Sequence, residues 1–255
     1  MTQFLACEDN KLAFLKREGE GCGLVWLGGW RSDMHGSKAE YLDAVAARHG
    51  FPLLRFDYSG HGLSTGHWSE GTITKWVAES RAIFDHAAPN ACILVGSSMG
   101  AWITLRLAAE LQKSADSHRI KGIVLIAPAP DFSMELIEPK LTEAERRDLA
   151  AKGWFEEKSD YLPEPNRWSQ AFLDDGRKNR VLNGIIHTHC PVHILQGQKD
   201  EDVPFSHALK LVSHLPADRV TLILVPDGDH RLSRPQDLEL LEKTVLAMLQ
   251  SVKVN

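Results

Sequence analysis

The chain of 255 residues contains only four cysteines, and their spacing shows none of the pairs typical of metal sites or disulfide frameworks. Cys92 and Cys190 lie in or beside apolar runs, which indicates reduced thiols in a core and suits the cytoplasm. No apolar run approaches the length of a membrane span. The N-terminus also lacks the basic start of a signal peptide and the arginine-rich character of a transit peptide. We therefore expect a soluble, cytoplasmic protein.

An excess of basic charge is absent as well. The formal net charge is −5, and the lysine and arginine residues are scattered without forming a basic stripe. These features argue against nucleic acid or an anionic membrane as a partner. The sequence has neither internal repeats nor low-complexity tracts, and its 43% hydrophobic content is enough for a substantial core. This length fits one large domain or two small ones at most, and we predict a single α/β domain over residues 1–255.

Apolar patterning predicts strands that alternate with helices along most of the chain. The expected strands cover residues 11–18, 23–27, 51–57, 91–95, 122–127, 192–196 and 220–225. The expected helices cover residues 38–49 (with Ser37 as N-cap), 72–86, a stretch from 99 onward, 206–215 and 236–250. Because several of the strands are continuously apolar, the pattern predicts a mostly parallel sheet covered by helices on both faces.

Residues 131–188 break this alternation. The segment is charged, contains prolines and shows no β-pattern, and Thr142 and Glu145 fit a capping box at the start of a helix over 142–152. So long an insertion between two core strands is interpreted as a helical cap rather than a linker. Its aromatic side chains either pack the cap onto the body or contact an apolar substrate group. The candidate substrate-pocket residues are Trp154, Phe155, Tyr161 and Trp168.

The most informative motif surrounds Ser98. The run Gly96-Ser97-Ser98-Met99-Gly100 follows an apolar strand and precedes a helical pattern, which is typical of a strained turn that exposes a nucleophilic serine. Glycines are needed because a Cβ there would collide with a neighbouring strand or helix. The same turn brings the Met99 N–H to the helix start, where an oxyanion would form. We predict Ser98 as nucleophile and Met99 as an oxyanion donor, with a purely structural turn as the alternative.

A serine nucleophile needs a general base that is itself held in place. Asp200 and His230 each follow an apolar strand, and loops at the carboxyl ends of parallel strands meet at one edge of a sheet. The chain order Ser, Asp, His then predicts His230 as the base and Asp200 as the acid that orients it. Asp202 is the competing acid, and Glu201 is a weaker one.

A second oxyanion donor is expected from the loop after the strand at 23–27. The loop reads Gly28-Gly29-Trp30, and two glycines allow the backbone to approach a substrate closely, so that the Trp30 N–H can point at the developing charge. The alternative is a plain turn.

Other polar residues resemble functional sites less well. Four potential metal ligands lie close together in the sequence: His187, His189, Cys190 and His193. Pro191 separates them and no second ligand cluster follows, so we expect neither a metal nor a cofactor. His61 lies between two glycines, which favours packing or a solvated side chain over a role as base. Asp57 is expected to bind loop backbone.

Taken together, the motifs resemble the α/β-hydrolase superfamily over nearly the full length, at residues 28–30, 57–64, 96–100, 197–204 and 228–230. Within it the chain is similar to the abhydrolase-domain palmitoyl-protein thioesterases, also known as mycophenolic acid acyl-glucuronide esterases. The finer cues are residues 55–60, 72–76, 93–100, Trp102, 152–154, Tyr161 and 229–231. The resemblance implies an α/β-hydrolase fold with Ser98, Asp200 and His230 as a catalytic triad.

The sequence differs from the pattern of this family in two respects. Ala101 replaces an expected second glycine, and the mitochondrial address of the animal enzymes is missing, so the chain resembles a bacterial cytosolic relative. The expected activity is hydrolysis of a small-molecule ester or thioester through an acyl-enzyme. The alternatives are a catalytically silent binding protein of the same fold, or a perhydrolase or C–C bond hydrolase that uses the same triad.

Overall fold

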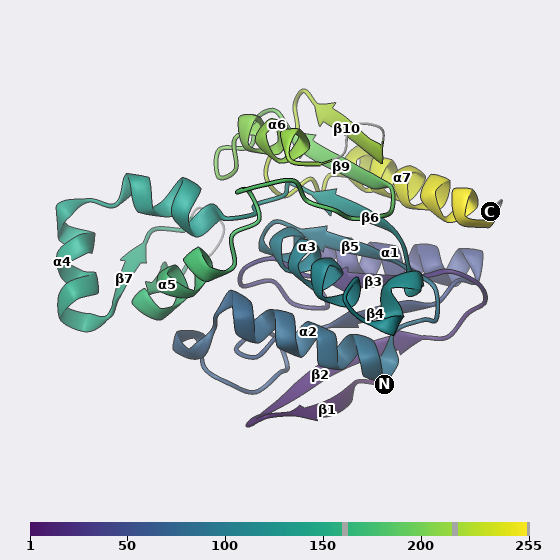
Figure 1. Cartoon of the computed structure of the whole chain (residues 1–255), viewed down its shortest axis with the longest axis horizontal. Helices are drawn as coiled ribbons and strands as arrows, with labels where there is room; N and C mark the ends of the chain where they lie inside the picture. The colour runs from purple at the N-terminus through teal and green to yellow at the C-terminus, as the bar shows by residue number, and fades with distance from the viewer. Residues whose placement is uncertain (160–162, 216–218, 254–255) are drawn as a thin grey trace.

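The fold is organised around one large β-sheet (Figure 1). The computed structural model describes residues 1–159, 163–215 and 219–253. Within these ranges an eight-stranded sheet has the order β1-β2-β4-β3-β5-β6-β9-β10, parallel from β4 to β10 and antiparallel at β1 and β2. The strands are β1 (Gln3–Cys7), β2 (Asn10–Arg17), β3 (Gly23–Leu27), β4 (Leu53–Phe56), β5 (Cys92–Ser97), β6 (Ile120–Ile126), β9 (Val192–Gly197) and β10 (Val220–Val225).

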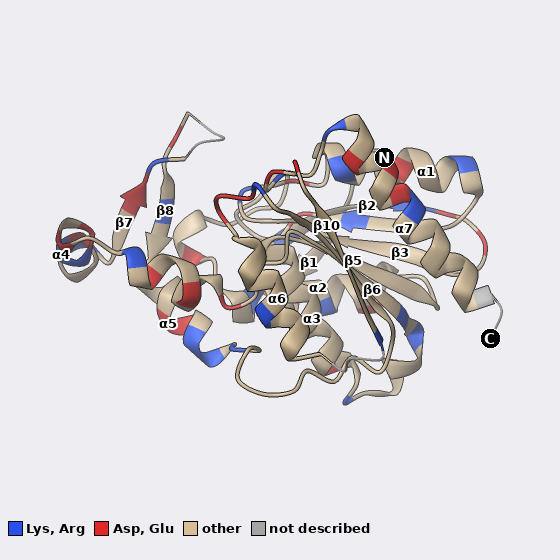
Figure 2. Ribbon diagram, turned by 90° about the horizontal axis from the view of Figure 1, so that it is seen from above, with Lys and Arg blue, Asp and Glu red and all other residues tan. Residues whose placement is uncertain are grey.

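Helices cover both faces of this sheet (Figure 2). Apolar side chains of α1 and α7 pack on one face, and those of α2, α3 and α6 pack on the other. The strands between them are buried because each face is covered, which confirms the predicted α/β architecture. No helix in the described ranges combines the length and apolar character needed to cross a membrane. The helices are α1 (Ser37–His49), α2 (Ile73–Ala87), α3 (Met99–Leu111), α6 (Phe205–Ser213) and α7 (Pro235–Lys253), with 3₁₀ turns η1 (Trp68–Glu70) and η2 (Ala115–Arg119).

Element boundaries differ locally from the sequence prediction. The edge strand β1 was not predicted, because its mostly exposed residues give only a weak apolar signal. Ser37 is the first residue of α1 rather than its N-cap, since Gly36 occupies that position without a side-chain hydrogen bond. Thr72 lies just before α2 and caps it by accepting the Lys75 N–H at 3.1 Å.

The insertion between β6 and β9, residues 131–188 and here called the cap, projects from one end of the sheet (Figure 1). It contains η3 (Ser133–Ile137), η4 (Glu138–Lys140), α4 (Glu143–Lys152), β7 (Trp154–Glu157), β8 (Asn166–Ser169) and α5 (Gln170–Lys178). The capping box of Thr142 and Glu145 is present, as predicted. The prediction that the cap contains no β-strand was wrong, because β7 and β8 form an antiparallel pair. Four-residue strands are too short to give a clear alternation, and their pairing depends on the folded cap.

Candidate active site

Ser98 lies between β5 and α3 in a strained backbone conformation. Its φ of 54° and ψ of −118° are rare for a residue with a side chain, as expected for a turn that exposes a hydroxyl. A Cβ on Gly96 would lie 2.4 Å from the Thr104 Oγ1, and one on Gly100 would lie 2.1 Å from the Leu27 carbonyl oxygen. The two glycines are therefore required by close approach, as the sequence predicted.

Ser98, His230 and Asp200 form a hydrogen-bonded chain across three loops. The His230 Nε2 lies 3.0 Å from the Ser98 Oγ, and its Nδ1 lies 2.8 Å from the Asp200 Oδ2. Asp200 is buried, and its Oδ1 accepts the Val203 N–H at 2.8 Å and the Asp202 N–H at 3.1 Å. These contacts fix the carboxylate against the imidazole. The arrangement can hold the histidine with its Nε2 as proton acceptor toward the serine.

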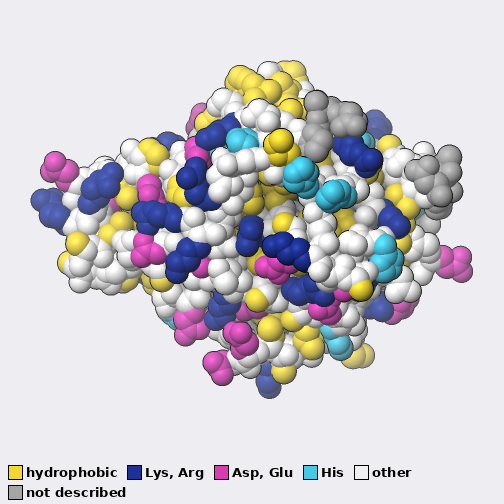
Figure 3. Space-filling model, viewed as in Figure 1, with side chains coloured by type: hydrophobic (Ala, Val, Ile, Leu, Met, Phe, Trp, Pro, Cys, Tyr) yellow, Lys and Arg dark blue, Asp and Glu magenta, His cyan; other side chains and the backbone are white. Residues whose placement is uncertain are grey.

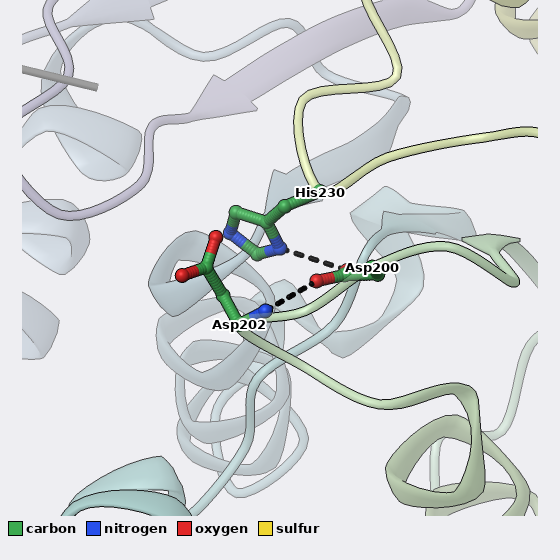
Figure 4. A group of neighbouring side chains, drawn as sticks. All are labelled: Asp200, Asp202 and His230. Atoms are coloured by element: carbon green, nitrogen blue, oxygen red, sulfur yellow. Dashed lines mark hydrogen bonds and ion pairs between the residues drawn. The ribbon is translucent and has the colours of Figure 1, made fainter. Parts of the chain in front are cut away.

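The three candidate acids occupy different positions around His230. Asp200 binds Nδ1 from a buried site, whereas Glu201 and Asp202 are exposed. Figure 4 shows the Asp202 carboxylate beside the imidazole ring, on a different side from Asp200. The geometry therefore favours Asp200 over Asp202 as the group that orients the ring.

Asp200, Asp202 and His230 also form the one group of three potential metal ligands found in the described part of the chain, with ligand atoms within 4.8 Å of one another. Both imidazole nitrogens already lie at hydrogen-bond distance from Ser98 or Asp200. A metal bound to His230 would therefore displace one of these contacts. The expectation that no metal takes part stays a prediction.

The loop after β3 lies directly against the nucleophile. A Cβ on Gly29 would lie 3.2 Å from the Ser97 carbonyl oxygen and 3.3 Å from the Ser98 Cβ, so only glycine allows this approach without displacing a neighbour. Trp30 and Ser98 line the same cavity, and Met99 is the first residue of α3. Trp30 thus lines the cavity beside Ser98, and Met99 directly follows Ser98 in the chain, while the role of their N–H groups as oxyanion donors stays a prediction.

Asp57 binds loop backbone, as predicted, and in doing so it connects the loop after β3 to the loop after β4. Its carboxylate accepts the Met34 N–H at 2.7 Å and the Leu63 N–H at 2.8 Å, and burial raises its pKa. His61 packs rather than acting as a base. It is buried edge-on against Trp76, with ring centroids 5.2 Å apart, and burial lowers its pKa, which keeps it neutral.

A cavity of about 500 Å³ opens beside Ser98 and His230. Apolar side chains from the cap and from the loop after β9 form part of its wall: Phe132, Leu136, Ile137, Trp168 and Val203. Charged side chains of both signs form another part: Arg31, Asp33, Lys38, Lys140, Glu157, Lys158, Glu201, Asp202 and Arg231. Figure 3 likewise shows basic and acidic side chains together on the projecting cap. The cavity can therefore take an apolar group next to a polar one.

Only one of the predicted substrate-pocket residues in the described part of the chain lines the cavity. Trp168 lines the cavity, whereas Trp154 and Phe155 do not, which corrects the prediction for these two. Phe155 is buried within the cap and Trp154 packs edge-on against Trp68, because side chains alternate along β7. Tyr161 lies outside the described residues.

Other cavity residues were missed. Phe132, Leu136 and Ile137 follow β6, at the sheet edge that also carries Ser98, so their position after a strand was a usable signal.

Lys38, in the first turn of α1, was also missed. Its Nζ donates to the Arg231 carbonyl oxygen at 2.5 Å and to the Ser233 Oγ at 3.3 Å, which ties α1 to the segment directly after His230. Burial lowers the pKa of Lys38 to about 8. The main acceptor is a backbone carbonyl 193 residues away, for which a sequence carries no signal.

Known proteins share both the sequence pattern and the fold. Residues 24–239 match the alpha/beta hydrolase family. The mitochondrial palmitoyl-protein thioesterase ABHD10 of Mus musculus is 32% identical over 235 residues, covering 92% of this chain and 77% of the mouse protein. A putative hydrolase from Agrobacterium vitis superimposes with a TM-score of 0.94 at 52% identity over 98% of each chain. The mouse alpha/beta hydrolase domain-containing protein 10 gives 0.88 at 29% identity over 99% of each. These matches confirm the resemblance drawn from the motifs, and the chain belongs to the alpha/beta hydrolase family.

Proposed function

We propose that this protein is a serine hydrolase that cleaves carboxylic esters or thioesters of small to medium acyl groups. The observation that carries the proposal is the hydrogen-bonded chain from the Ser98 Oγ through His230 to the buried Asp200, at 3.0 Å and 2.8 Å. A binding protein has no need of this geometry, whereas a serine nucleophile depends on it.

The proposed mechanism follows from the positions of the side chains. His230 takes the Ser98 proton as the Oγ attacks the acyl carbon, and Asp200 stabilises the resulting imidazolium. The N–H groups of Met99 and Trp30 donate to the oxyanion of the tetrahedral intermediate. His230 then protonates the leaving alkoxide or thiolate, and water releases the acyl group from Ser98 by the same steps in reverse order.

The cavity supports an acyl substrate with a polar leaving group. The apolar wall formed by Phe132, Leu136 and Trp168 suits a hydrocarbon chain, and the charged wall suits a hydrated group. The thioesterase named among the relatives supports a thioester as one of the substrates.

The dependence on acyl-chain length tests this substrate class. Each methylene buried against the apolar wall contributes about 0.8 kcal/mol, so we expect kcat/KM to rise about fourfold per added methylene until the cavity is full. The measurement is kcat/KM for p-nitrophenyl esters and acyl-CoA thioesters of increasing length, with a peptide amide as control.

A flat profile, or amide cleavage as fast as ester cleavage, would contradict the acyl pocket. Labelling of Ser98 with a fluorophosphonate tests the enzyme itself, because a silent hydrolase fold does not activate its serine. An active protein that forms peracids or cleaves C–C bonds but not esters would point to the alternative reactions instead.

Treatment with EDTA is expected to leave the esterase activity unchanged, because both His230 nitrogens are engaged by Ser98 and Asp200 in the proposed mechanism. The measurement is the hydrolysis rate after prolonged dialysis against the chelator, compared with dialysis against buffer. Loss of activity that zinc restores would assign Asp200, Asp202 and His230 to a metal instead.

A further inference from the structure

The loop of residues 28–36, which carries the Trp30 backbone, is held by the body of the protein at its two ends. The Tyr58 hydroxyl donates to the Gly28 carbonyl oxygen at 3.3 Å. At the other end, the Met34 N–H donates to Asp57 at 2.7 Å, and the Arg55 guanidinium donates to the Met34 carbonyl oxygen at 2.7 Å. The middle of the loop, at Trp30 and Arg31, also has partners in the cap.

The middle of the loop, at Trp30 and Arg31, contacts the cap as well as the body. The Arg31 Nη1 donates to the carbonyl oxygens of Glu164 and Pro165 at 3.0 and 2.8 Å, and its Nη2 lies 3.4 Å from the Glu164 carboxylate. The Trp30 indole stacks on Trp168 of the cap, with ring centroids 4.3 Å apart and planes at 28°. On the body side it packs edge-on against Trp76 and His61, with ring centroids 5.7 and 6.3 Å apart. The cap therefore contacts both the side chain of Trp30 and the residue that follows it.

The backbone at Arg31 is also strained. Its φ of 53° lies in the left-handed region, which residues with a Cβ rarely occupy. Such a conformation persists only where the surroundings impose it. Within the loop, the Ser32 N–H donates to the Gly29 carbonyl oxygen at 3.1 Å and closes a turn around Trp30 and Arg31. The Arg31 guanidinium, hydrogen-bonded to two carbonyl oxygens of the cap, constrains the same turn from outside the loop.

We propose that Arg31 is a positioning residue that couples the cap to the oxyanion donor at Trp30, an inference that rests on the proposed function. The fork of the Arg31 guanidinium holds the loop in its strained turn, and the turn aims the Trp30 N–H toward Ser98. The coupling makes oxyanion stabilisation depend on how the cap sits over the cavity. A substrate that fills the cavity against Trp168 thereby also secures the catalytic loop.

Arg31→Ala is the direct test in the full-length protein. Because oxyanion stabilisation acts in the transition state, we expect kcat for a short p-nitrophenyl ester to fall about tenfold to a hundredfold with KM nearly unchanged. Acylation and deacylation both pass through an oxyanion, so the loss appears whichever step limits turnover. The affinity of a boronic acid, which forms a tetrahedral adduct with the serine, is expected to fall by a similar factor.

Three further variants separate the coupling from simpler roles. Arg167→Ala removes an ion pair with Glu156 inside the cap and the contact of the guanidinium with the rings of Trp68 and Trp154. It disturbs the cap and its contact with the body without touching the loop of residues 28–36, and is expected to keep wild-type kcat. Arg31→Gly relieves the strained φ without restoring the clamp, so it is expected to lose kcat as Arg31→Ala does. Arg31→Lys keeps the charge and a single donor nitrogen but not the planar fork of the guanidinium, and is expected to give an intermediate kcat. The lysine variant also provides the test if the alanine variant fails to fold.

The outcomes distinguish the two proposals. Wild-type kcat in Arg31→Gly or Arg31→Ala, or a raised KM with intact kcat, would overturn the coupling and leave the proposed function standing. An equal loss in Arg167→Ala would also overturn it, since any disturbance of the cap would then suffice. A wild-type protein that neither hydrolyses esters nor binds the boronic acid would overturn the proposed function, and the coupling with it.

Discussion

Replacing Ser98 by alanine is expected to abolish the turnover of short p-nitrophenyl esters and to leave the melting temperature nearly unchanged. The hydroxyl is the proposed nucleophile, and neither His230 nor the oxyanion donors can replace the covalent step. The substitution removes the hydrogen bond between Ser98 and His230 from the folded protein, while alanine keeps the strained φ of 54° just as serine does. We expect kcat to fall by more than about a thousandfold. Steady-state kinetics and thermal unfolding of the same preparation provide the measurement.

The exposed Ser69, in η1, offers a matched control. Ser69→Ala makes the same chemical change at a residue that does not line the cavity and is expected to keep full activity. Residual turnover above about a thousandth of wild type in Ser98→Ala would point to the neighbouring Ser97, which also lines the cavity, or to a different mechanism.

The central sheet could be predicted from the sequence because its strands are apolar on both faces. β3, β5 and β6 are buried almost along their whole length, and this burial appears in the sequence as continuous apolar runs. β1 has a single neighbour and mostly exposed side chains, so its position depends on pairing with β2 rather than on its own pattern. The pair of β7 and β8 likewise forms through contacts between separate parts of the cap.

The candidate active site likewise has parts that the local sequence reveals and parts that depend on tertiary contacts. Ser98, Asp200 and His230 could be identified because each follows a core strand, and the parallel topology brings the ends of such strands together. The residues of the cavity wall could not be identified in this way, because the fold of the cap decides which of its aromatic side chains line the cavity: Trp168 does and Phe155 does not. The contacts of Arg31 with backbone carbonyls more than 130 residues away depend on tertiary structure alone.

Asp200→Asn and His230→Gln are expected to cost several orders of magnitude in kcat, with the larger loss at His230. Without the imidazole no base remains at 3.0 Å from the Ser98 Oγ, and the expected loss is on the order of 10⁶. In Asp200→Asn the N–H groups of Val203 and Asp202 retain the oxygen at the Oδ1 position, two donors against the single Gln196 amide that donates to Oδ2. The new amide group therefore faces the His230 Nδ1 as a donor. The imidazole then carries its proton on Nε2 and cannot accept one from Ser98, for an expected loss on the order of 10⁴.

Asp202→Asn is the matched control for the acid assignment, since it makes the same change two residues away on the same loop. The Asp202 side chain is exposed, and its N–H bond to Asp200 comes from the backbone and survives the substitution, so kcat is expected to stay within a few-fold of wild type. The measurement is kcat and KM for all three variants on one ester, with circular dichroism to verify folding. Severe loss in Asp202→Asn together with a mild effect of Asp200→Asn would reverse the assignment, because the carboxylate beside the imidazole would then be the one that supports the charged ring.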